Sequence, residues 1–250
     1  MLSSNILGNV QLHFTMQTFL QKLVKFWQNN LHHRIASLIT TVGTVGLVSC
    51  LIIIYVIAQI SDDVLDREAF AFDKTILLWI HSFANPTLDG IMRFITRFND
   101  PSTVTVIAAV VLGLLLWRRY YSEAKIFVVD CLGGVILSYG LKSVFGKARP
   151  DLWQSAIEDL SYSYPSGHAL GSTVLYGFLA YLIATRYPQF SFLVYAVAVF
   201  LIGAVGLSRL YLGVHWPTDI IGGYGIGFLW LTFCITMLKL QRIKRLQTSK

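Results

Sequence analysis

The stretch SRLYLGVHWPTD, residues 208–219, separates two long apolar runs of the chain. Proline is favoured at the first position of a helix, where no backbone N–H is needed, so Pro217 predicts a helix start. Asp219 would then lie in the first turn and reach back towards His215. A carboxylate beside an imidazole fixes its tautomer and supports positive charge on it, and Arg209 can hold an oxyanion through two parallel hydrogen bonds. The stretch therefore predicts a phosphate-handling histidine at a membrane surface.

The composition is that of a membrane protein. Of the 250 residues, 55% are hydrophobic and 13% are charged, against about 25% charged in soluble domains. The mean hydropathy is +0.61. The net charge of +7 is typical of basic cytoplasmic loops, and no basic tract with interleaved aromatics indicates a nucleic-acid partner. The three cysteines are far apart and predict buried thiols, with neither a disulfide nor a metal site.

Six predominantly apolar runs predict membrane-spanning helices. They cover residues 35–60, 101–117, 126–144, 167 or 168 to 184, 192–207 and 217–238. The glycines of the last run are expected to permit tight helix packing. The segment between the first two runs is rich in charged residues, and its apolar positions predict two short amphipathic helices along the membrane surface, one on each side of Asn85-Pro86. The predicted fold class is an all-α polytopic membrane protein with six transmembrane helices plus these short surface helices.

The predicted domain organisation has three parts. Residues 1–34 form a cytoplasmic N-terminal segment, for which an interfacial anchor and a loosely ordered tail are both open. Residues 35–240 form the six-span membrane domain, and residues 241–250 form a basic cytoplasmic tail.

The charge distribution predicts the orientation. An even number of spans puts both termini on one side. That side holds most of the lysines and arginines and a single acid, Glu123. The positive-inside rule therefore predicts that both termini are cytoplasmic and that the protein is a multi-pass protein of the plasma membrane. The loops at residues 61–100, 145–166 and 208–216 face outward in this arrangement.

Two more polar groups lie on the predicted outer side. The first is the stretch KSVFGKARP, residues 142–150, and the second is PSGH, residues 165–168. Spans three and four form one outward hairpin, and spans five and six form another. All three polar groups are therefore expected to meet at one membrane face.

Each group is suited to phosphate chemistry. Lys142, Arg149 and Arg209 supply positive charge. Ser166 and Gly167 at a helix start present a hydroxyl and free backbone N–H groups, and a helix N-terminus favours anions. Two histidines are available, one with an acid behind it and one, His168, without. That division favours a nucleophile and a general acid.

The three groups together resemble the three-part signature of the type 2 phosphatidic acid phosphatase superfamily. That family includes lipid phosphate phosphatases and, as soluble relatives, vanadium haloperoxidases and acid phosphatases. The matching positions are Lys142, Arg149-Pro150, Pro165-Ser166-Gly167-His168, Ser208-Arg209, His215 and Asp219. The resemblance covers about residues 60–240 and implies a haloperoxidase-like helical core. Tyr164 stands where phenylalanine is more usual, at a position without a catalytic role.

The resemblance implies a phosphohistidine mechanism without metal or other cofactor. His215 would attack phosphorus, Asp219 would orient it, and His168 would protonate the leaving oxygen. Water would then hydrolyse the phosphoenzyme. The residues implied to hold the phosphoryl oxygens are Lys142, Arg149, Ser166, Gly167 and Arg209.

The predicted function is a membrane lipid phosphate phosphatase with a phosphorylated lipid as its partner and no obligatory protein partner. Undecaprenyl diphosphate, phosphatidate and phosphatidylglycerophosphate are the candidate substrates, with a slight preference for the first. One alternative is a phosphotransferase that passes the phosphoryl group to a lipid or sugar. Another is a non-catalytic phosphate-binding scaffold or transporter, which the intact histidines disfavour. Haloperoxidase chemistry is a weaker alternative.

Three charged or polar residues outside the motifs are expected to have structural roles. Lys147 lies between Lys142 and Arg149 and is interpreted as solvated. An acid within a span is a functional candidate by default, but Asp130 lies near the start of the third span and matches no motif. It is therefore interpreted as a structural hydrogen-bonding group or as exposed at the interface. His81 is expected to pack against its surroundings.

Overall fold

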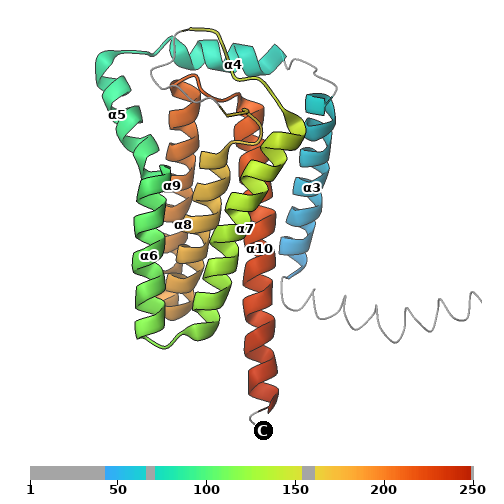
Figure 1. Cartoon of the computed structure of the whole chain (residues 1–250), viewed down its shortest axis with the longest axis vertical. Coiled ribbons are helices and arrows are strands. Elements are labelled where there is room, and N and C mark those ends of the chain that lie inside the picture. Colours follow the sequence, from blue (N-terminus) through green and yellow to red (C-terminus); the bar gives the residue numbers. More distant parts are fainter. Residues whose placement is uncertain (1–42, 66–70, 154–160, 249–250) are drawn as a thin grey trace, which may run out of the picture. The chain divides into compact units, whose positions relative to one another are not determined.

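The computed structural model describes residues 43–65, 71–153 and 161–248 of the chain (Figure 1). The chain divides into two units, residues 1–49 and residues 50–250. Of the first unit, only residues 43–49 are described, and they begin helix α3 (Thr44–Leu65). The predicted N-terminal segment, residues 1–34, lies outside the described residues. The functional residues predicted from the sequence all lie in the second unit.

Every regular element in the described part of the chain is helical. After α3 come α4 (Ala71–His81), α5 (Pro86–Thr96), the 3₁₀ helix η2 (Arg97–Asn99), α6 (Pro101–Trp117), α7 (Tyr121–Phe145), α8 (Gly167–Arg186), the 3₁₀ helix η3 (Pro188–Phe190), α9 (Ser191–Tyr211) and α10 (Pro217–Thr248). The predicted all-α fold class is confirmed. The helix α10 continues through most of the predicted basic tail.

Five of the described helices are long and apolar enough to cross a bilayer: α3, α7, α8, α9 with η3, and α10. The helix α6 begins and ends at the predicted residues, 101 and 117, but it has only 17 residues. Together with α5 and η2 it forms a run bent by 45°, which becomes a sixth candidate span if it is taken as one. The helices α4 and α5 occupy the places of the two predicted surface helices, and the count of six spans stays a prediction.

Helix α8 lies at the centre of the packing in the second unit, with α7, α9 and α10 beside it (Figure 1). Glycines on α10 allow the closest approach. A Cβ added at Gly223 would lie 2.7 Å from the Ser166 carbonyl oxygen, and one at Gly227 would lie 2.9 Å from Thr173 Cβ. The predicted role of the α10 glycines in tight helix packing is confirmed. This contact brings the first turns of α8 and α10 together.

Two hydrogen-bonded contacts fix α4 and α5 to the ends of the long helices. Asp73 on α4 accepts from the Thr218 backbone N–H at 3.0 Å and from its hydroxyl at 2.6 Å, so a carboxylate caps the N-terminus of α10. Tyr211 at the end of α9 donates to Asp89 Oδ1 at 2.7 Å and accepts from the Asn85 N–H at 3.2 Å. Both contacts lie at the end of the helices where the predicted motifs are found.

Asp130 lies on α7 and is fully buried. Its backbone carbonyl accepts a hydrogen bond from the Trp230 indole of α10 at 2.9 Å. Interfacial exposure, one of its two predicted roles, is therefore wrong. His81 stacks on Trp153 with ring centroids 4.0 Å apart, as its packing role predicted.

Candidate active site

The three predicted motifs meet at one end of the helices. The first spans the C-terminal end of α7, the second leads into the first turn of α8, and the third runs from the last turn of α9 through the connecting turn to the first turn of α10. The backbone N–H of Ser166 donates to the Asp219 carbonyl at 3.0 Å, which joins the second motif to the third. The Arg149 guanidinium donates to the Val214 carbonyl at 2.6 Å, which joins the first to the third. The sequence prediction that the motifs share one face is consistent with these contacts.

His215 lies in the turn before α10 and is 1% exposed. The turn depends on Gly213, which has φ +70° and whose missing Cβ would lie 2.7 Å from the Trp153 ring. Glycine meets both demands, because other residues rarely adopt this backbone conformation and would also collide with the ring. Pro217 begins α10 as predicted, and Asp219 in its first turn lies with Oδ2 3.3 Å from His215 Nδ1.

Both carboxylate oxygens of Asp219 are held by further donors. Oδ2 accepts from the Trp216 backbone N–H at 2.8 Å and from the Ser163 hydroxyl, and Oδ1 accepts from Lys147 Nζ at 2.9 Å. The residue is fully buried. A buried carboxylate is stable only when it is paired and hydrogen-bonded, and these donors meet that requirement. They also fix the orientation of the oxygen that faces the imidazole.

The prediction that Lys147 is solvated is wrong. Besides Asp219, its ammonium group donates to Thr218 Oγ1 at 2.7 Å and lies 3.7 Å from Asp73 Oδ2, and its side chain is 15% exposed. The cause is the end of α7, where Gly146 adopts a left-handed conformation with φ +57° and turns the chain back. Two buried carboxylates then offer Lys147 a more favourable environment than a solvated loop position.

Arg149 places positive charge beside the other ring nitrogen of His215. Its Nη1 lies 3.3 Å from His215 Nε2, while its Nε donates to the Ser161 carbonyl at 2.7 Å. The Ser161 hydroxyl accepts from Arg149 Nη2 at 3.0 Å and from Lys142 Nζ at 2.8 Å. Two cations predicted to bind phosphate thereby share one serine, and one of them, Arg149, lies beside His215 Nε2.

Burial lowers the pKa of His215 to about 3, against an ordinary value of 6.5. The Asp219 carboxylate acts in the opposite direction, and the charges of Arg209 and Arg149 lower the pKa further. The imidazole is therefore neutral near pH 7. With its proton on Nδ1 facing Asp219, the ring directs the lone pair of Nε2 towards Arg149.

His168 has an acid beside it, contrary to the sequence prediction. Its Nε2 lies 3.3 Å from Asp100 Oδ1, and its backbone carbonyl accepts from Asn99 Nδ2 at 3.2 Å. Asp100 lies between η2 and α6, 68 residues before His168, so no local spacing could reveal it. The histidine side chain is 18% exposed, which leaves it accessible to a proton donor or acceptor from solvent.

Arg209 is buried near the end of α9, with 2% exposure. Its Nη1 donates to Thr96 Oγ1 at 3.2 Å, so the end of α5 helps to position it. Its charge acts on His215, which places it within electrostatic reach of the imidazole.

The two residues that precede His168 shape the start of α8. The Ser166 hydroxyl caps the helix by accepting from the Ala169 N–H at 3.4 Å. A Cβ at Gly167 would lie 2.9 Å from Ser138 Oγ, so the absence of a side chain lets α8 begin close to α7. Their part in phosphate binding, like that of the other predicted ligands, stays a prediction.

The sequence interpretation missed several residues that contact side chains of the three motifs. Those residues are Asp73, Thr96, Asp100, Ser161 and Ser163. Ser161 and Ser163 are close to the second motif in sequence and could have been suspected from the run of hydroxyls before it. Within the described residues, no three His, Cys, Asp or Glu side chains are grouped as metal ligands. The metal-free mechanism nevertheless stays a prediction.

Known proteins are similar to this chain in both sequence and fold. The family model of the PAP2 superfamily matches residues 123–243, which contain all three motifs. Phosphatidylglycerophosphatase B of Bacillus subtilis is 30% identical over 148 residues, which are 58% of this chain and 72% of that protein. The chain belongs to the PAP2 superfamily. The resemblance drawn from the three motifs is thereby confirmed.

Other PAP2 proteins extend the comparison. An undecaprenyl-diphosphatase of Sulfolobus acidocaldarius is 29% identical over 152 residues, which are 59% of this chain and 68% of that protein. The crystal structure of a transmembrane PAP2-type phosphatidylglycerolphosphate phosphatase from Bacillus subtilis has a TM-score of 0.65 at 24% identity, covering 75% of this chain and 92% of that one. The fold is thus that of a PAP2 membrane phosphatase. The protein is a multi-pass membrane enzyme of the phosphoric monoester or diphosphate hydrolase class.

Proposed function

We propose that this PAP2 protein hydrolyses phosphomonoester or pyrophosphate lipids through a phosphohistidine intermediate, without a metal ion. The candidate substrates are undecaprenyl diphosphate, phosphatidate and phosphatidylglycerophosphate. The observation that carries the proposal is the arrangement around His215. Its Nδ1 faces the buried Asp219 carboxylate at 3.3 Å, and its Nε2 lies 3.3 Å from the Arg149 guanidinium, where a phosphoryl group would be bound.

The first step transfers the phosphoryl group to the enzyme. His215 Nε2 attacks phosphorus, the N–P bond forms, and the bond from phosphorus to the lipid oxygen breaks. His168 gives its proton to that oxygen as it leaves. Asp219 stabilises the positive charge that develops on the His215 ring, and the guanidinium of Arg149 stabilises the phosphoryl oxygens. Phosphoryl transfer depends mainly on such positioning and charge stabilisation.

The second step releases phosphate. Water attacks phosphorus and gives a proton to His168, which was left neutral by the first step. The N–P bond then breaks and returns His215 to its neutral form. The Asp100 carboxylate, 3.3 Å from His168 Nε2, would hold the ring in position at each turnover.

The proposed site faces the outer side of the plasma membrane. Its motifs all lie at the ends of spanning helices, at the level where a lipid headgroup would be found while the tail remains in the bilayer. Basic residues gather at the other ends of these helices, including Arg118 after α6 and Arg186 at the end of α8. By the positive-inside rule, that end and both termini would be cytoplasmic.

A substrate panel tests the proposed function. The full chain, purified in detergent with a chelator present, should release inorganic phosphate from one or more of the three candidate lipids. Activity that is lost with chelator and restored by a divalent cation would overturn the metal-free mechanism. Release from none of the three lipids would overturn the proposed substrate class. Phosphate that appears on an added lipid or sugar acceptor, instead of in solution, would favour the phosphotransferase alternative.

Lys147 is expected to act as a positioning residue through Asp219. Replacing it with methionine removes the donor to Asp219 Oδ1 and should lower kcat by about 100-fold with little change in KM, because a small displacement of a catalytic group costs about that much. Lys147→Arg should recover part of the loss. Steady-state kinetics of both variants give the measurement. Lys74→Met is the matched control, because Lys74 is an exposed lysine of α4 at the same end of the helices. An unchanged kcat in Lys147→Met, or an equal loss in the control, would contradict the role.

A further inference from the structure

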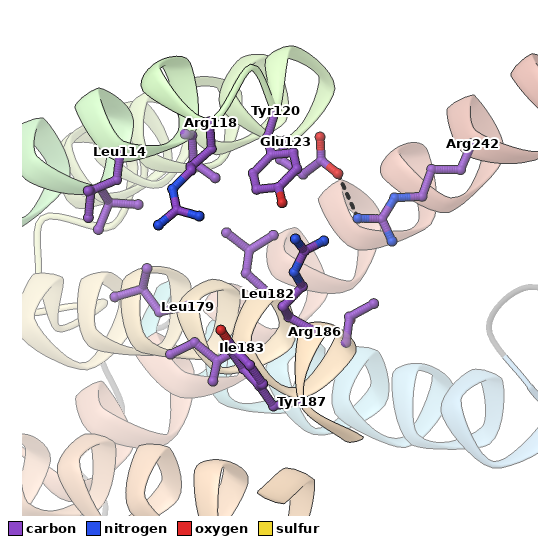
Figure 2. Close-up of a pocket in the computed structure, with 13 residues that line it drawn as sticks. Leu114, Arg118, Tyr120, Glu123, Leu179, Leu182, Ile183, Arg186, Tyr187 and Arg242 are labelled. Atoms are coloured by element: carbon purple, nitrogen blue, oxygen red, sulfur yellow. Dashed lines mark hydrogen bonds and ion pairs between the residues drawn. The ribbon is translucent and has the colours of Figure 1, made fainter. Parts of the chain in front are cut away.

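A cavity lies at the end of the helices opposite to His215. It has a volume of about 610 Å³ and opens between α6 and α8 (Figure 2). Its wall is apolar, with Leu114 from α6 and Leu179 and Ile183 from α8. Leu114 is 49% exposed and Ile183 is 45% exposed, so the wall is open at the side where these spanning helices would face lipid.

The rim of the cavity is basic. Arg118 follows α6, Arg186 ends α8, and Arg242 comes from α10. Glu123 is the acid of the rim and binds Arg242 through a 2.8 Å ion pair. Three arginines and one glutamate leave a net charge of +2 on this rim.

The guanidinium groups of Arg118 and Arg186 both point into the space between α6 and α8 (Figure 2). The Arg186 guanidinium lies over the Tyr120 ring, 5.1 Å from its centroid, which fixes its direction. Among the residues that the structure describes, neither of these two arginines is paired with a carboxylate. Their hydrogen-bond donors are therefore available to an anionic group in the cavity.

The length of α8 separates this cavity from the active site. His168 lies in the first turn of α8 and Arg186 is its last residue. At a rise of about 1.5 Å per residue the two are about 27 Å apart, close to the thickness of a bilayer core of about 30 Å. The cavity is therefore at the level of the other membrane surface and is distinct from the phosphatase site.

We propose that this cavity binds an anionic phospholipid of the leaflet at its own end. The phosphate would accept hydrogen bonds from Arg118 and Arg186, and an acyl chain would lie along Leu114 and Ile183. The net positive rim favours an anionic headgroup over a zwitterionic one, and the open apolar wall favours a lipid over a soluble anion. The proposal is independent of the function proposed for His215.

Native mass spectrometry of the full chain in detergent tests this site with phosphatidylglycerol, whose phosphate is a diester, and with phosphatidylcholine. Phosphatidylglycerol should bind more tightly. The double variant Arg118→Gln/Arg186→Gln should weaken its binding by about thirtyfold, and Arg118→Gln alone, at an exposed position, by about fivefold. Lys125→Gln is the matched control, an exposed lysine near the same end that does not line the cavity, and it should bind as the unchanged protein does.

Two further measurements distinguish lipid binding in this cavity from binding at the phosphatase site and from a loss of folding in the variants. The variant Arg149→Gln, which removes a cation proposed to hold phosphate beside His215, should retain tight phosphatidylglycerol binding, because the lipid is not held at the phosphatase site. The melting temperature in lipid-free detergent should be the same for both variants that carry Arg118→Gln and the unchanged protein, while added phosphatidylglycerol should raise it only where binding is retained. The proposal is overturned if phosphatidylcholine binds equally well, if the Arg118 and Arg186 variants bind phosphatidylglycerol unchanged, or if Arg149→Gln abolishes binding.

Discussion

The substitution His215→Ala should lower kcat by about 10⁶-fold, the loss typical of removing a covalent nucleophile. No other imidazole in the described residues contacts both a buried carboxylate and a guanidinium in this way. The variant keeps Arg149 and Lys142, so it should still bind the lipid phosphate. Single-turnover measurements with substrate labelled in the transferred phosphate separate these effects, because binding persists while release stops.

The same labelled substrate tests the covalent intermediate. The unchanged protein, stopped with alkali during turnover, should retain label on the chain, and the label should be lost on acidification because an N–P bond is acid-labile. His215→Ala should retain none. His81→Phe is the matched control, since it removes a histidine at the same end of the helices but preserves the stacking on Trp153, and it should retain full activity. Phosphate release by His215→Ala at a rate near that of the unchanged protein would assign the nucleophile to another residue.

Local sequence patterns were sufficient to predict where most of the described helices lie in the chain. The predicted helix starts at Pro101, at Pro217 and next to Ser166 agree with the structure, because a proline or a capping hydroxyl acts within one turn of its own position. Helix ends were less predictable. The helix α10 continues ten residues past the predicted end of its apolar run because Lys, Arg and Gln are good helix formers once outside the bilayer.

The predicted motifs identified the residues that come together at one end of the helices, since each motif is short and joined to a span. Their supporting partners could not be found in this way. Asp73 and Asp100 belong to a segment with many acids, and only the packing of α4 and of the α5–α6 run selects these two. Lys147 was misassigned because its partner Asp219 is 72 residues away, and a loop lysine without a known partner is usually solvated.

The second large effect is expected for Asp219→Asn, which should lower kcat by about 10⁴-fold, as for other histidines that lose an orienting carboxylate. Both oxygens of Asp219 accept from donors, Lys147 on one side and the Trp216 N–H on the other. An asparagine must therefore turn its amide N–H₂ towards one of these donors. The side chain is displaced, and no negative charge remains to stabilise the His215 imidazolium as the N–P bond forms.

The pH dependence of activity distinguishes stabilisation of the His215 imidazolium by Asp219 from an effect of Asp219 on the protonation state of His215. Burial holds the pKa of His215 at about 3 even though Asp219 raises it, so the imidazole of the unchanged protein loses its nucleophilic form only near pH 3 and not near 6.5. Removing the Asp219 charge lowers this pKa further, and His215 stays neutral. The activity of Asp219→Asn should therefore remain low from pH 4 to 9, measured as kcat/KM. Recovery of activity with rising pH would contradict the stabilising role.

The low pKa of His215 also makes the stability of the folded protein depend on pH, so the pH series needs a stability control. Unfolded His215 takes up a proton below about pH 6.5, whereas the folded imidazole resists protonation down to about pH 3. The folded state therefore loses stability as the pH falls through this interval, and melting temperatures must accompany each activity. Asp151→Asn is the matched variant, an exposed aspartate beside the first motif, and it should follow the unchanged protein in both measurements. Where the melting temperature of Asp219→Asn is normal, its loss of activity is then due to the chemical step, because the folded site is present and lacks only the carboxylate charge.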